Sequence, residues 1–305
     1  MRLFIFLSLF VSFGCLPRQT PSSPSPTITA EQVAALKSLR TSVRAWAPLC
    51  TGDIACGLRD GNQEDGDSML WAGLLCASGE ASQCGPAKAS FRSDGQVCRS
   101  PTKLDLDKNS SSRDMFLGAM LYVATTKDQS AAGSALEYIK ANDYKLCTDA
   151  VDNRCEISPT VNSPLWGTMG TVWSHIGLPK SQEMKDASNS DDTLIKFQSS
   201  FSEAGYPTHL VAVQLYLRQK VDSWSQQLQD AAIIVSNRQP NNPFYSFVAY
   251  GPNTRAAQLV LEKCPTEKPE LTYQWAWQRD EEEQAWLKSK GWDCIFMVNV
   301  LVGAE

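Results

Sequence analysis

The feature that most limits how this chain can fold is a helical spacing of apolar residues, which continues from residue 29 almost to the C-terminus. In the first segment, which a Thr29–Gln32 capping box opens and Pro48 ends, apolar residues recur every three or four positions. They are Val33, Leu36, Leu39, Val43 and Trp46. No segment shows a convincing two-residue alternation of the kind a half-buried strand has. The sequence therefore predicts an all-α protein.

Caps and breakers divide this pattern into about eleven or twelve helices. The segment 115–123 carries apolar side chains on all sides, so its helix should be central. The stretch 208–240 is either one long helix or two helices joined near Lys220. The predicted helices cover residues 29–47, 68–79, 82–90, 111–126, 129–141, 164–176, 191–204, 208–240, 254–263, 280–289 and 292–302.

The connections between these helices are short, and short connections place successive helices side by side in opposite directions. We therefore expect antiparallel helix pairs in a single all-α domain over residues 29–305, arranged like an (α/α) toroid and stapled by disulfides. No sequence repeat of fixed length is present, which argues against a solenoid of the tetratricopeptide type.

The N-terminal sequence MRLFIFLSLFVSFGC predicts export. One Arg precedes an apolar run too short to span a bilayer, which is the layout of a signal peptide over residues 1–14. Cys15 follows Gly14 as in the bacterial lipoprotein box, which predicts lipidation of Cys15. Ser12 and Gly14 also suit an ordinary small-x-small cleavage site. Residues 15–28 form a Pro/Ser tether, so we expect a membrane-anchored lipoprotein that faces the periplasm or the cell exterior.

The chain contains ten Cys residues, and an exported chain with this many is expected to form disulfides. Short spacings predict local bridges, and a further bridge would close the C-terminal segment. The predicted pairs are Cys50–Cys56, Cys147–Cys155 and Cys264–Cys294. Cys84 has two possible partners, Cys76 and Cys98, and the sequence leaves this choice open. No two Cys stand in Cys-x-x-Cys spacing, so a zinc ribbon or a thioredoxin-type centre has no support.

Acidic loops lead into two of the most apolar helices, and they supply the candidate catalytic residues Asp65, Asp67 and Asp114. If the helices run up and down, alternate loops share one rim, where a general acid and a base or nucleophile can meet. Arg113 could pair with Asp114 and lower its pKa. The alternative is that these side chains cap their own helices, because first-turn N–H groups need acceptors.

A calcium site is a weaker alternative for the second acidic loop. Asp105, Asp107 and Asn109 have the one-three-five ligand spacing of a calcium loop. Ser110 replaces the Gly expected at the sixth position, and Phe116 stands where a bidentate Glu belongs. We therefore predict no metal site and no cofactor.

The segment YQWAWQRDEEEQAW places Trp275 and Trp277 among polar side chains, next to an acidic run. Aromatic rings in polar surroundings can stack on sugar rings, so both Trp residues, together with Arg113, are candidate binding residues. The alternative is that Trp275 and Trp277 plug the end of the helical array.

Several function classes lack their sequence signals. The net charge is −5 and no Lys/Arg cluster is present, so a nucleic-acid partner is not expected. The chain has no Gly-x-Ser-x-Gly, no His-Glu-x-x-His, no phosphate loop and no dinucleotide fingerprint. Carboxylate chemistry, which is typical of glycan cleavage, is what remains.

At GDSMLWAGLLCASGE, SRDMFLGAMLY and GWDCIFMVNVL the chain resembles a group of exported bacterial proteins, and its paired helices resemble glycan-active (α/α)-toroid enzymes. The second resemblance implies a glycoside hydrolase or polysaccharide lyase that acts on cell-wall or extracellular polysaccharide. The competing hypothesis is a non-catalytic surface lipoprotein that binds a glycan or a surface protein.

Overall fold

The computed structural model describes residues 27–50, 54–55, 68–102, 104, 111–147, 155–160, 162–188, 190–269, 276–278 and 289–304. Within these ranges the chain is helical, apart from one short antiparallel hairpin of strands β1 (Leu49–Cys50) and β2 (Ile54–Ala55). Two 3-10 turns, η1 (Ala81–Gln83) and η3 (Ala276–Gln278), complete the described elements. The predicted all-α class is confirmed.

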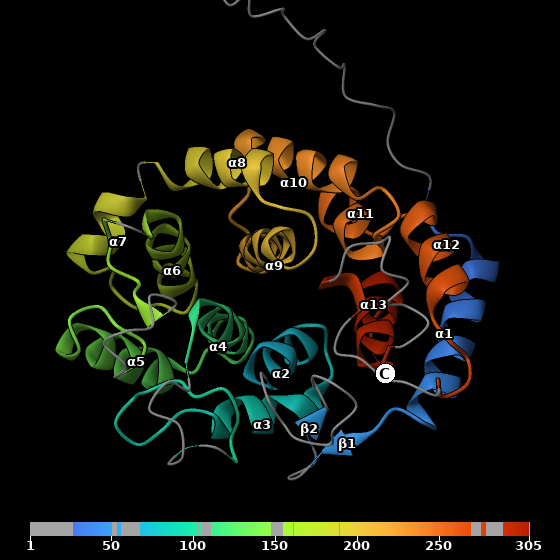
Figure 1. The fold of residues 1–305 in the computed structure, drawn as a ribbon, viewed down its shortest axis with the longest axis horizontal. Helices are drawn as coiled ribbons and strands as arrows, with labels where there is room; N and C mark the ends of the chain where they lie inside the picture. Colours follow the sequence, from blue (N-terminus) through green and yellow to red (C-terminus); the bar gives the residue numbers. More distant parts are fainter. Residues whose placement is uncertain are drawn as a thin grey trace, which may run out of the picture.

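The helices lie in two concentric layers (Figure 1). The outer layer consists of α1 (Ala30–Arg44), α3 (Cys84–Ala89), α5 (Gln129–Ala141), α7 (Gln182–Ala187), α8 (Asp191–Phe201), α10 (Gln226–Arg238) and α12 (Thr254–Lys263). The inner layer consists of α2 (Ser68–Ala77), α4 (Arg113–Thr126), α6 (Ser163–His175), α9 (Tyr206–Lys220), α11 (Pro243–Tyr250) and α13 (Trp292–Val302).

Apolar patterning explains which layer a helix occupies. All residues of α2 are buried, and so is nearly all of α11, because helices that are apolar on all sides must be covered on all sides. In the outer helix α1, only one stripe is buried, consisting of Leu36, Leu39, Arg40 and Val43. The segment 115–123, which we predicted to be central, lies in the inner helix α4.

The inner helices form a closed circuit of contacts, in the order α2, α4, α6, α9, α11, α13 and back to α2. The first turns of α2, α9 and α11 meet at one end: His209 of α9 lies 5.7 Å from Trp71 of α2 and 5.9 Å from Phe244 of α11, between ring centroids. We call this the N-terminal end of the ring. The arrangement agrees with antiparallel helix pairs, and assignment to the (α/α)-toroid class stays a prediction.

One open choice is resolved, and two described helices were not predicted. The stretch 208–240, for which the sequence allowed one long helix or two helices joined near Lys220, forms two: α9 ends at Lys220, and a turn in which Asp222 has a positive φ of 51° separates it from α10. Helices α7 and α11 were not predicted, because α7 is only six residues long and α11 is apolar on nearly every side. Most of the predicted helix 280–289 lies outside the described residues.

Three disulfides link described residues. Cys147–Cys155 and Cys264–Cys294 are confirmed, and the open choice is resolved as Cys76–Cys84. Cys98, the other possible partner of Cys84, is buried. The predicted Cys50–Cys56 pair includes Cys56, which lies outside the described residues. None of the described helices is both long enough and apolar enough to cross a membrane.

Candidate functional site

Asp114 is the predicted catalytic residue whose position the structure describes. It lies in the first turn of α4 at the N-terminal end of the ring, and it is 7% exposed. Its two carboxylate oxygens accept hydrogen bonds from the Ser112 and Tyr206 hydroxyls. Ser112, the residue before α4, makes no side-chain cap to the helix. The carboxylate is therefore turned across to α9, and the capping alternative is wrong for Asp114.

Tyr206 reaches Asp114 because of the turn that precedes α9. Gly205 has a φ of 86°, which favours glycine, and Pro207 in the first turn fixes the start of the helix. The Gly205 N–H donates to the Gln239 side chain at 3.0 Å, and the Tyr245 hydroxyl donates to the Gly205 carbonyl at 3.5 Å. Tyr206 as a whole is 40% exposed, and its hydroxyl is anchored on Asp114.

His209 lies beneath Tyr206 and has no exposed surface. Its ring is stacked 6.4 Å from Tyr206, and it also faces Trp71 and Phe244. Neither imidazole nitrogen has a hydrogen-bond partner among the described residues. Burial lowers the pKa of His209 to about 3, because the protonated ring would lose its hydration. The imidazole is therefore neutral at physiological pH.

Arg113, a predicted binding residue, points away from Asp114. Its Nη1 donates to Asn162 Oδ1 at 3.2 Å, and Asn162 in turn donates to the Glu156 carbonyl at 3.1 Å. The two side chains connect the starts of α4 and α6 in an exposed contact. The expected Arg113–Asp114 ion pair is absent from the described residues, because Asp114 is already occupied by two hydroxyls.

Trp277 is fully buried, which contradicts its predicted role as a sugar platform. Its ring lies 5.9 Å from Phe244 and 5.3 Å from Phe296, inside the aromatic centre of the ring. The turn that carries it is held over α11, because Asn242 Nδ2 donates to the Trp277 carbonyl at 2.8 Å. Its burial agrees with the alternative in which this residue plugs the helical array.

Asp293 is a second carboxylate in this region, and it has a structural role. It is buried in the first turn of α13, and it accepts hydrogen bonds from the Ser289 hydroxyl and from the N–H groups of Ala276 and Cys294. Burial raises its pKa, and these hydrogen bonds oppose the rise. Its bonds with Ala276 and Ser289 fasten the η3 turn and residue 289 to α13.

The other predicted site residues lie outside the described residues. These are Asp65, Asp67, Trp275, Cys15 and the weak metal candidates Asp105, Asp107 and Asn109. Among the described residues, no group of three or more His, Cys, Asp or Glu side chains could hold a metal ion.

Sequence reasoning missed Tyr206 and His209. The signal that could have found them is Gly-Tyr-Pro at a helix start, followed by His in the first turn. Such a pattern places an aromatic ring at a turn and an imidazole on the helix below it. Only the contact of α9 with α4 then reveals that both residues belong with Asp114.

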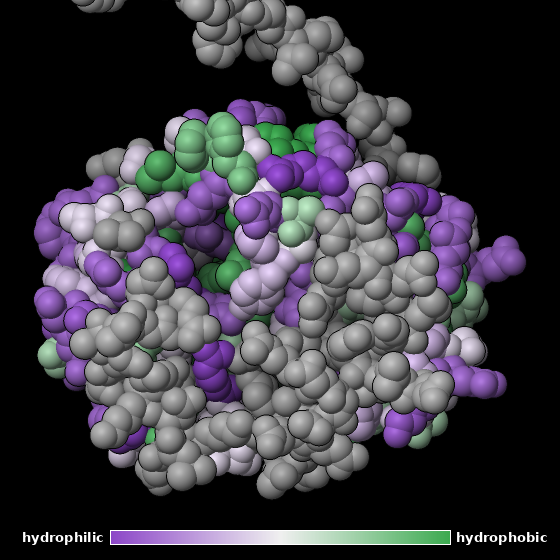
Figure 2. Space-filling view, viewed as in Figure 1, coloured by the Kyte–Doolittle hydropathy of each residue, from purple (hydrophilic) through white to green (hydrophobic). Residues whose placement is uncertain are grey.

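The molecule viewed along the ring axis shows hydrophilic side chains around a hollow that has hydrophobic side chains at its base (Figure 2). At the N-terminal end of the ring, the described residues offer a carboxylate, a phenol, a guanidinium and an amide. This set can form hydrogen bonds with a hydroxyl-rich molecule, and its phenol and carboxylate can move protons.

Comparisons of the chain with protein-family models, with curated proteins and with solved structures find no match.

Proposed function

We propose that this protein is an exported, lipid-anchored enzyme that cleaves a cell-wall or extracellular polysaccharide at the N-terminal end of the ring. The observation that carries the proposal is the contact of the Tyr206 phenol with the Asp114 carboxylate, where α4 and α9 begin together. The predicted signal peptide and Cys15 support export and membrane anchoring, and three disulfides favour folding in an oxidising compartment.

The chemistry assigned to this pair is proton transfer. The phenol oxygen of Tyr206 keeps acceptor capacity for a substrate hydroxyl or glycosidic oxygen while its proton is shared with Asp114. Ser112 holds the other carboxylate oxygen, so the acid–base pair is oriented before substrate binds. A positioned acid or base of this kind contributes about 100-fold to 10,000-fold to a rate.

A hydrolase needs a second carboxylate, and the sequence supplies candidates just before α2. Helix α2 packs directly against α4 and begins at Ser68, one residue after Asp67. The proposal therefore keeps Asp65 or Asp67 as the partner of Asp114. Arg113 and Asn162, which are hydrogen-bonded to each other in an exposed contact, provide polar groups for a neighbouring sugar unit.

The test is a polysaccharide cleavage screen with the full-length protein, followed by Asp114→Asn and Tyr206→Phe. We expect each variant to lose at least about 100-fold in turnover, while its thermal unfolding stays close to that of the wild type. Asp230→Asn is the matched control, because Asp230 pairs with Lys196 on the outer layer.

Three results would discriminate the alternatives. Cleavage that survives Asp114→Asn contradicts the assignment of this residue. Glycan binding without cleavage supports the competing hypothesis of a non-catalytic lipoprotein. Loss of turnover in Asp230→Asn would mean that the assay reports stability and not chemistry.

A further inference from the structure

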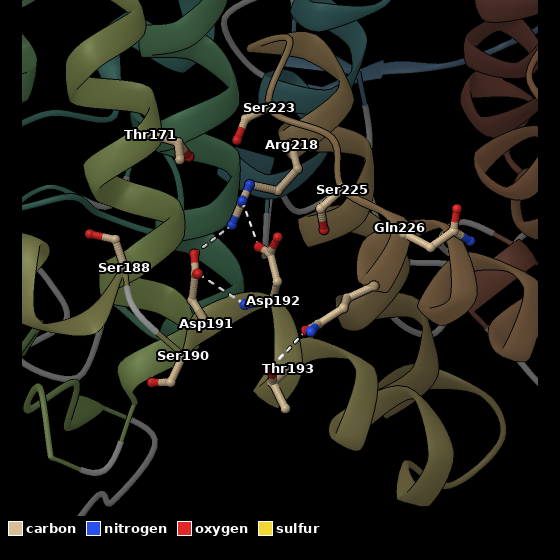
Figure 3. A pocket seen from close by; sticks show the side chains of 11 residues that line it. Thr171, Ser188, Ser190, Asp191, Asp192, Thr193, Arg218, Ser223, Ser225 and Gln226 are labelled. Carbon is tan, nitrogen blue, oxygen red and sulfur yellow. Dashed lines mark hydrogen bonds and ion pairs between the residues drawn. The ribbon is translucent and has the colours of Figure 1, made fainter.

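A second site-like feature lies between α6, α8, α9 and α10, away from Asp114. It is an open cavity of about 580 Å³, large enough for a small organic molecule. Figure 3 shows its lining from close by. All lining residues are polar: Thr171, Ser188, Ser190, Asp191, Asp192, Thr193, Arg218, Ser223, Ser225, Gln226 and Gln227.

The charged groups of the cavity are two carboxylates and one guanidinium. Arg218 Nη1 lies 2.6 Å from Asp191 Oδ2, and Arg218 Nη2 lies 2.7 Å from Asp192 Oδ1. Arg218 is 4% exposed, and its buried Nε–H has no partner among the described residues. One positive charge between two negative charges leaves the lining with a net charge of −1.

Hydrogen-bonding capacity in the cavity is only partly used. Asp192 Oδ2 and the hydroxyls of Ser190 and Ser223 form no hydrogen bond with another described residue, whereas Gln227 accepts one from Thr193. The Asp192 side chain is 24% exposed, so its second oxygen can accept from a bound molecule. The two carboxylates outnumber the one guanidinium, so the cavity offers a ligand more negatively charged acceptors than positively charged donors.

The lining excludes two classes of ligand. An apolar ligand would find no apolar side chain among the lining residues, and burying their hydroxyls and carboxylates against it would leave them unpaired. An anion would meet two carboxylates and an Arg whose two terminal nitrogens are each already paired with one of them. A molecule with many hydroxyls and a positive charge satisfies both the acceptors and the net charge.

We propose that this cavity is a binding site for a small amine-bearing polyhydroxyl ligand of the amino-sugar class. It is separate from the N-terminal end of the ring, because Arg218 and Tyr206 lie near opposite ends of α9, about 18 Å apart along the helix. The site does not depend on the proposed glycan cleavage, and either can exist without the other.

The experiment compares three probes that share one ring and differ in charge: glucosamine, glucose and glucuronate. Binding to the full-length protein is followed by calorimetry or ligand-observed NMR. We expect affinity to fall in the order glucosamine, glucose, glucuronate, with at least about a tenfold difference between the first and the last. Equal binding of all three, or no binding of glucosamine, overturns the proposal.

The variant Asp192→Asn tests which residues carry the effect, because it removes the net charge but keeps the buried Arg218–Asp191 pair. We expect glucosamine to bind about tenfold more weakly and the preference over glucose to disappear. Glu262→Gln on α12 is the matched control, because Glu262 is exposed and its partner Gln258 lies outside the lining, so this variant should bind glucosamine as the wild type does. Glucosamine binding that Asp192→Asn leaves unchanged would place the ligand elsewhere.

Discussion

His209 is buried among aromatic side chains inside the ring of inner helices. Its two imidazole nitrogens have no hydrogen-bond partner among the described residues. An unsatisfied buried polar atom costs about 1–3 kcal/mol, so this residue lowers the stability of the fold. His209 lies one helical turn from the Tyr206–Asp114 contact, so this unpaired polar residue is next to the candidate site.

The variant His209→Phe should remove a pH dependence of stability. The folded protein holds the pKa of His209 at about 3, whereas the unfolded chain binds the same proton near pH 6.5. The destabilisation caused by the lowered pKa of His209 is therefore absent above about pH 6.5 and grows as pH falls towards about 3. Between about pH 7.5 and pH 5, the variant should gain about 2 kcal/mol relative to the wild type.

Urea unfolding of both proteins at the two pH values measures this gain. His175, the other histidine in the chain, is present in both proteins and cancels in the comparison. Unfolding free energies that change in parallel with pH would mean that His209 is hydrated or paired in solution.

Part of the candidate site could be predicted at the scale of single residues. Asp114 was found because an acidic side chain before an apolar helix is visible in the sequence. Its bonding was not, because the Tyr206 phenol comes from a position 92 residues away. Trp277 was misjudged for a related reason: polar neighbours in sequence say nothing about Phe244 and Phe296, which bury it.

At the scale of elements, α2 and α4 pack with their backbones in close approach. A Cβ added to Gly118 would lie 2.4 Å from the Met69 carbonyl oxygen, and one added to Gly73 would lie 2.1 Å from the Gly118 carbonyl oxygen. Only glycine fits at either position. This close contact brings the start of α4, and with it Asp114, beside the start of α2.

The variant Gly118→Ala should therefore destabilise the protein, although Ala is the better helix former. Overpacking a core costs about 1–3 kcal/mol, and here the obstacle is backbone that cannot turn aside. Gly133→Ala in the outer helix α5 is the matched control, because a Cβ there meets nothing within 4 Å. It should stabilise by about 0.5–1 kcal/mol. Chemical denaturation of both variants gives the comparison, and equal stabilities would rule out the close approach.

The elements themselves were largely predictable, and the exceptions have physical causes. The Thr29–Gln32 capping box forms as the sequence indicated, and α1, α5 and α12 follow their apolar stripes. Helix α11 has no such stripe, because seven of its eight residues are buried and its pattern resembles any short apolar run. Periodicity detects helices that are half covered, and it fails where a helix is covered on every side.

At the scale of the whole molecule, the two ends of the described chain close the ring. Helix α1 packs against α12 and α13, and α13 also contacts α2. The buried Arg40 of α1 donates to Asn299 Oδ1 at 2.9 Å and to the Gly303 carbonyl at 2.7 Å, while Asn299 reaches Ser78 at 3.4 Å. One Arg therefore connects the first helix to the last and, through Asn299, to the end of α2.

The variant Arg40→Met tests whether this connection stabilises the closed ring. It keeps much of the apolar stem but leaves the buried Asn299 Oδ1 without this donor, and a buried acceptor left unsatisfied costs about 1–3 kcal/mol. The Gly303 carbonyl also loses the donor, but Gly303 is exposed and water can replace it. We expect the free energy of unfolding to fall by about 1–3 kcal/mol. Lys37→Met, an exposed position on the same helix, should change it by less than about 0.5 kcal/mol. The closed ring brings Asp114 and Tyr206 together, so Arg40→Met should also speed backbone amide hydrogen exchange at these two residues if the ring opens as one unit. Unchanged exchange at both residues would show that α1 detaches alone.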